Sequence, residues 1–93
     1  MNVEVAIEQI ARIKYLLSLP STEVFWSKYS NTNEVIIDLE LPEKGLRSRD
    51  RNAIQQILLL LAPTGALQEI SLSSGWADEF LVIAEAIETA LGK

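Results

Sequence analysis

Apolar residues recur every three or four positions at the start of the chain, which is the spacing of one face of an α-helix. Asn2 can cap the first turn of such a helix, and Glu4 suits the positive end of its dipole. Pro20 cannot continue a helix and marks its end. The pattern therefore predicts a helix over about 3–19. Its buried stripe consists of Val3, Ala6, Ile7, Ile10, Ile13 and Leu17.

In the segment 34–41, apolar residues recur at every second position. Such alternation of apolar and polar residues is typical of a half-buried β-strand. The preceding segment 24–29 is rich in β-branched and aromatic side chains, and the polar residues 30–33 favour a turn. The sequence therefore predicts an antiparallel hairpin, with the alternative that 24–29 extends a helical region. The aromatic residues of this segment, interpreted as core and not as a base-stacking platform, are Phe25, Trp26 and Tyr29.

A loop over 42–45 precedes a second predicted helix, for which Ser48 or Asp50 supplies the cap. Pro63 ends this helix after Ala62, because the residue before a proline is steered away from helical conformation. The core stripe of the helix is Ile54, Ile57, Leu58 and Leu61.

A short third strand is predicted over 67–73, with Ile70 and Leu72 pointing inward. Ser74 and Gly75 then open a third helix, which has acidic residues in its first turn as the helix dipole prefers. The core stripe of this helix is Trp76, Phe80, Ile83, Ala84, Ile87 and Leu91.

These elements follow the order α-β-β-α-β-α, which predicts an α+β fold. A small mixed three-stranded sheet is expected to pack with three helices, most of them on one face. The second strand, the second helix and the third strand form a β-α-β unit, for which a right-handed crossover is expected. A chain of 93 residues is short, so 1–93 is predicted to be a single domain.

The chain contains neither cysteine nor histidine. It therefore forms no disulfide and uses no thiolate, and it lacks the commonest general base and transition-metal ligand. Serines such as Ser71 have no histidine to activate them. The carboxylates of 34–41 are interpreted as a solvated sheet face and not as a metal site. We expect no enzymatic activity, no catalytic residue, no cofactor and no metal.

The net charge of −5 and the pI near 4.6 describe an acidic domain, which disfavours binding to the phosphate backbone of nucleic acids. No apolar run reaches the roughly 18 residues that a membrane span needs. The first ten residues do not have the pattern of a signal peptide. We therefore expect a cytoplasmic protein that binds no membrane and whose partner is another protein or a second copy of itself.

Four of the eight basic residues fall within 44–51, before a predicted helix N-terminus whose free N–H groups favour anions. This turn is a candidate site for an anion, a nucleotide or a nucleic acid. The alternative is a solvated loop that Glu43 and Asp50 partly neutralise, since the chain has no glycine-rich phosphate-binding motif. The candidate residues are Lys44, Arg47, Ser48, Arg49 and Arg51.

Three apolar residues lie off the predicted core positions: Ile36 on the acidic strand face, Leu59 on the second helix and Val82 on the third. They are either scattered surface residues, which are common, or the interface of a homodimer or of a complex with a partner. The predicted function is a non-catalytic protein–protein interaction or regulatory module. An inhibitor whose acidic face covers a basic active site belongs to the same class.

Overall fold

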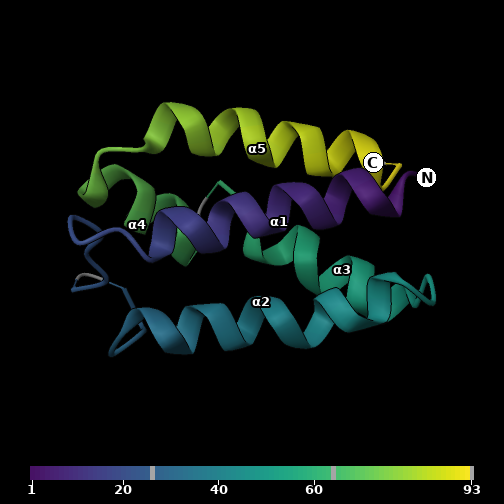
Figure 1. Ribbon diagram of the computed structural model, residues 1–93, viewed down its shortest axis with the longest axis horizontal. Helices are drawn as coiled ribbons and strands as arrows, with labels where there is room; N and C mark the ends of the chain where they lie inside the picture. The colour runs from purple at the N-terminus through teal and green to yellow at the C-terminus, as the bar shows by residue number, and fades with distance from the viewer. Residues whose placement is uncertain (26, 64, 93) are drawn as a thin grey trace.

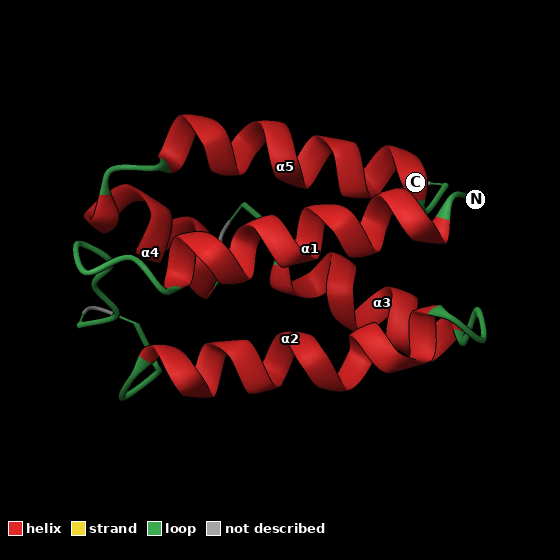
Figure 2. Ribbon diagram, viewed as in Figure 1, coloured by secondary structure: helices red, strands yellow, loops and turns green. Residues whose placement is uncertain are grey.

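The structure, a computed structural model, describes residues 1–25, 27–63 and 65–92, and these ranges contain five α-helices and no β-strand (Figure 1 and Figure 2). The helices are α1 (Val3–Leu17), α2 (Thr32–Leu46), α3 (Arg51–Leu60), α4 (Ala66–Ser74) and α5 (Ala77–Ala90). The fold is therefore all-α. The predicted α+β fold, with its three-stranded sheet and β-α-β crossover, is wrong.

Helix α1 lies between α5 and α2 and packs against both (Figure 1). It runs antiparallel to α5. The Asn2 N–H donates a 2.6 Å hydrogen bond to the carbonyl of Ala90, so the first turn of α1 lies beside the last turn of α5. Helix α2 also packs on α3, and α4 packs on α5. The first and last helices are therefore direct neighbours.

The core fills the space between these helices with apolar side chains that are almost completely buried. The three helices predicted from their apolar stripes are confirmed as α1, α3 and α5, although α5 begins after the predicted start at 74–75. The largest buried apolar side chains are Ile10, Ile13, Leu17, Leu39, Leu46, Ile57, Leu67, Ile70, Phe80 and Ile87.

Helix α2 occupies the segment 34–41, which the alternating pattern assigns to a strand. Val35 and Leu39 are both buried and lie one helical turn apart. Asn31 Oδ1 accepts the Glu34 N–H at 3.0 Å, while the Glu34 carboxylate accepts the Asn31 N–H at 3.3 Å. Asn31, which was predicted to lie in a turn, and Glu34, which was predicted to begin a strand, therefore form a capping box that starts a helix.

Helix α4 replaces the third predicted strand. Leu67, Ile70 and Ser71 are buried at helical spacing, whereas Leu72, which was expected to point inward, is 62% exposed. Gly75 adopts a left-handed conformation with φ of 85° and ends α4, so it does not open the next helix as predicted.

The first predicted strand, 24–29, belongs to the connection between α1 and α2 and forms no strand in its described residues. Tyr29 is buried, as expected for a core residue, but Phe25 is 77% exposed. Trp26 lies outside the described residues.

Candidate interaction surface

The basic turn predicted as an anion site joins α2 to α3. The carboxylate of Asp50 accepts the Asn52 N–H at 2.9 Å, so a negative side chain occupies the N-terminus of α3. This cap repels an anion from the N–H groups that would otherwise attract it. The candidate residues are all exposed and run from the last turn of α2 to the first residue of α3: Lys44, Arg47, Ser48, Arg49 and Arg51.

Carboxylates accompany the cations of this turn. Arg47 Nη1 lies 3.5 Å from Oε1 of Glu4 on α1. Arg47 lines one depression together with Arg49 and Glu4, and a second depression together with Lys44 and Glu43. Among the described residues, Arg47 is the one cation of this turn that lies in ion-pair contact with a carboxylate. The anion site at this turn therefore stays a prediction.

Lys14 holds α1 to α2. Its Nζ lies 2.7 Å from Oε1 of Glu43 and 3.5 Å from Oε2 of Glu40. Burial lowers the pKa of Lys14, but the hydrogen bonds and charges of the two carboxylates outweigh burial, so the pKa lies above the ordinary value of a lysine. The ammonium of Lys14 therefore stays charged near neutral pH, and its ion pairs hold α1 against α2.

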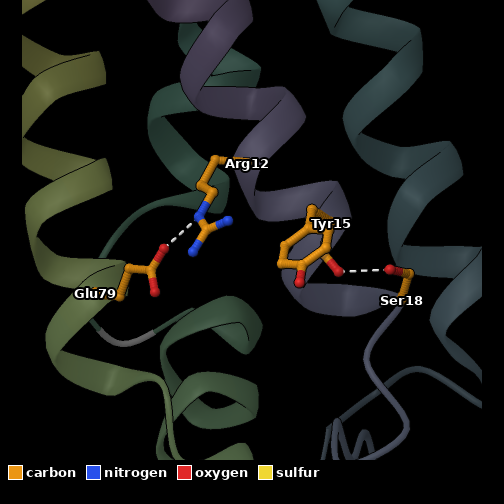
Figure 3. A network of polar contacts seen from close by, with 4 residues as sticks. All are labelled: Arg12, Tyr15, Ser18 and Glu79. Carbon is orange, nitrogen blue, oxygen red and sulfur yellow. Dashed lines mark hydrogen bonds and ion pairs between the residues drawn. The ribbon is translucent and has the colours of Figure 1, made fainter.

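Arg12 holds α1 to α5 (Figure 3). Its Nε donates a hydrogen bond to the carboxylate of Glu79, and its guanidinium carbon lies 4.8 Å from the centre of the Tyr15 ring. The Ser18 hydroxyl donates to the Tyr15 carbonyl at 2.6 Å at the end of α1. Arg12 therefore neutralises Glu79 on the side of α5 that faces α1.

Tyr29 fastens the connection between α1 and α2 onto α2. Its hydroxyl donates a 2.7 Å hydrogen bond to Oδ2 of Asp38. Burial, followed by the hydrogen bond and charge of Asp38 and the charge of Glu34, raises the pKa of Tyr29 above the ordinary value of a tyrosine. The folded state therefore favours the neutral hydroxyl of Tyr29 over the ionised form.

Tyr29→Phe is expected to lower the free energy of unfolding at neutral pH by about 1–2 kcal/mol, because the Asp38 carboxylate loses a hydrogen bond. A raised pKa in the folded state contributes stability that is lost as the pH rises above the value in the unfolded chain, about 10. Alkaline destabilisation should therefore be weaker in the variant, with the residual part coming from Lys14. Urea denaturation between pH 7 and about pH 11 measures both effects.

Tyr15→Phe is the matched control, because it changes an exposed tyrosine that has no hydrogen-bonded hydroxyl among the described residues. Phenylalanine keeps the aromatic ring that Arg12 contacts, so the free energy of unfolding at neutral pH should stay within about 0.5 kcal/mol of that of the parent protein. An identical alkaline profile for Tyr29→Phe and the parent protein would show that the Tyr29 hydroxyl does not bind Asp38.

An open groove of about 730 Å³ runs between the start of α1 and the second half of α5. Val82 is 69% exposed beside it, and the neighbouring Leu81 is 54% exposed. Val82 therefore exposes an apolar side chain in the groove itself, and Leu81, the residue before it on α5, exposes another outside the lining. The lining of this α1–α5 groove includes Met1, Val5, Val82, Glu85, Ala86 and Thr89.

The three apolar residues proposed as an interface do not share one surface. Val82 lines the α1–α5 groove, whereas Leu59, which is also exposed, lines a depression beside Tyr29. Ile36 is partly buried against the core. Leu81 was missed, although it too lies off the apolar stripe of the third predicted helix.

Two absences hold for the described residues. They contain no group of three or more Asp or Glu residues placed to hold a metal ion. None of the helices within them has both the length and the apolar character to cross a membrane.

Comparison with models of protein families, with curated proteins and with solved structures finds no match to this chain. A functional proposal therefore depends on the chemistry of the surface itself.

Proposed function

We propose that this chain is a non-catalytic protein–protein interaction module and that the α1–α5 groove, with Leu81 and Val82 at its edge, is the contact surface. The observation that best supports this proposal is the exposure of the two adjacent side chains. They lie beside a groove whose lining includes Val5 and Ala86. Burying an exposed leucine or valine contributes about 1.5–3 kcal/mol to association, so a partner that covers both gains substantially.

The charged contacts support the non-catalytic part of this proposal. A catalytic site gathers groups of shifted pKa in one cavity. Here the described groups with raised pKa are Arg12, Lys14 and Tyr29, and each joins a different pair of elements. Arg12 binds α5, Lys14 binds α2, and Tyr29 fixes a connection. The cytoplasmic location expected from the sequence remains part of the proposal, and cell fractionation tests it.

Site-specific photo-crosslinking in cells that express the protein tests this function. A benzophenone amino acid replaces Val82 in one variant and Gln55, an exposed residue of α3, in a matched control. We expect discrete adducts at Val82 that are absent at Gln55. Equal labelling at both positions, or none at Val82, would contradict the proposal. Adducts of twice the chain mass would identify the partner as a second copy.

A further inference from the structure

Carboxylates of α5 lie on either side of its exposed apolar residues at the edge of the α1–α5 groove. Helix α5 carries four acidic residues and no basic residue. Glu79 is the one that Arg12 neutralises. Within the described part of the chain, no lysine or arginine lies in ion-pair contact with Asp78, Glu85 or Glu88. The surface beside the groove is therefore both apolar and negatively charged.

Acidic and exposed apolar residues alternate along one face of α5. Asp78, Leu81, Val82 and Glu85 are all exposed and follow one another at helical intervals of three, one and three residues, so they share one face. Glu85 also lines the groove itself. An occupant that covers Leu81 and Val82 therefore brings its own flanking groups close to carboxylates one turn away on each side.

This charge pattern argues against a second copy as the occupant. Two copies docked through this face would bring the same unpaired carboxylates together, and each chain carries a net charge of −5. Like charges brought close at an interface repel and are costly to desolvate. The complementary occupant has cations on either side of an apolar stripe.

The shape of the groove points to a helix. Its walls are two antiparallel helices that lie side by side, and such a groove accepts the apolar face of a third helix (Figure 1). Binding by strand addition needs a free sheet edge, and the described ranges contain no strand. Helix α5 has 14 residues and is therefore about 21 Å long, which sets the length of helix that can lie along it.

We propose that the α1–α5 groove binds a basic amphipathic helix of another protein. This helix places leucine- or isoleucine-type side chains on Leu81, Val82 and Ala86. It places lysine or arginine side chains against Asp78 and Glu85. The inference rests on the proposed function and adds the chemical class of the partner.

Three synthetic peptides of about 14 residues, the length of α5, test the proposal against the full chain. The first has leucines at positions i, i+3, i+4 and i+7 with lysines flanking them. The second has the same composition in an order that scatters the leucines around the helix. The third replaces the lysines by glutamates. Amide chemical shifts of the labelled protein report both the affinity and the place of binding.

The first peptide is expected to bind with a dissociation constant of about 10–100 µM and to shift the amides of Val5, Val82, Glu85 and Ala86. The other two peptides should bind at least about 10-fold more weakly. Raising the salt concentration from about 50 mM to about 500 mM should weaken the first peptide roughly 10-fold, because flanking charges at a surface are screened. Equal binding of the first two peptides, or shifts outside the groove, would overturn the proposal.

A charge-reversed protein provides a second, independent readout. The Asp78→Lys/Glu85→Lys variant is expected to prefer the glutamate peptide over the lysine peptide by about 10-fold. Glu23→Lys/Glu69→Lys is the matched control: it makes the same change in net charge at exposed positions outside the groove lining and should keep the parent preference. An unchanged preference in the first variant would mean that these carboxylates do not contact the peptide.

The two proposals can fail separately. Adducts at Val82 that contain only a second copy of the chain, together with no preference for the lysine peptide, would retain the interaction module and overturn the basic helix. The absence of any adduct specific to Val82 would overturn the interaction module itself.

Discussion

Replacement of Phe80 by alanine is expected to lower the free energy of unfolding by about 3–5 kcal/mol. The Phe80 side chain is completely buried on α5, and its ring meets that of Trp76 edge-on, with centroids 6.4 Å apart. Alanine removes this contact and leaves a cavity that the surrounding helices fill only in part. Chemical denaturation followed by far-UV circular dichroism measures the loss.

The loss of stability expected for Phe80→Ala is a large part of the total stability of a small domain. Single domains have a total stability of about 5–15 kcal/mol, so the Phe80→Ala protein is expected to be partly unfolded on modest heating. Val82→Ala is the control on the same helix, and because Val82 is exposed, its effect should stay within about 0.5 kcal/mol. Equal losses of stability for the two substitutions would contradict the burial of Phe80 and the exposure of Val82 on α5.

Gly45→Val is expected to lower the free energy of unfolding by about 2–3 kcal/mol. A Cβ atom at Gly45 would lie 2.5 Å from the Cβ of Ala53, whereas non-bonded carbon atoms prefer about 3.5–4 Å. Gly45 lies near the end of α2 and Ala53 near the start of α3, so valine would force these two packed helices apart.

A double-mutant cycle isolates this contact. Ala53→Gly removes the atom that valine meets, although alone it costs about 1 kcal/mol of helix propensity. Combined with Gly45→Val, it should restore part of the stability, so that the double variant is more stable than the two single effects predict. Strictly additive effects would mean that α2 and α3 do not cross closely at Gly45.

Helices α1, α3 and α5 could be predicted because their apolar residues follow a single period. In α2 the stretch around Val35 and Leu39 satisfies the periods of strand and helix together, and its β-branched residues favour a strand. The decisive local signal is Asn31 followed by Glu34, which serves as a capping box and resembles a polar turn. Tertiary packing then overrides the propensities.

Pro42 shows that tertiary packing can outweigh an unfavourable helix propensity. The sequence predicts a loop at 42–45, and a proline inside a helix costs about 3 kcal/mol relative to alanine. In the structure Pro42 lies inside α2 and is buried. The loss of one helical hydrogen bond is therefore outweighed by contacts that no local pattern reveals.

The candidate site was only partly predictable for a similar reason. Val82 stands out in the sequence because it lies off an apolar stripe, and Leu81 carries the same signal. Val5 and Ala86 line the same groove because α1 lies beside α5, and no local sequence signal in either helix specifies that neighbour. The run of basic residues at 44–51 and the Asp50 within it are visible in the sequence, whereas the contact of Arg47 with Glu4 depends on α1 packing against α2 and is seen only in the structure.

The pairing of α1 with α5 also bears on the order in which the protein folds. Contacts between α2 and α3 and between α4 and α5 close short loops, so we expect them to form early. The pairing of α1 with α5 closes almost the entire chain and is expected late. A polypeptide in which α5 is still inside the ribosome lacks one wall of the α1–α5 groove. If the groove is the contact surface proposed above, its partner would bind only molecules in which α1 and α5 have already paired.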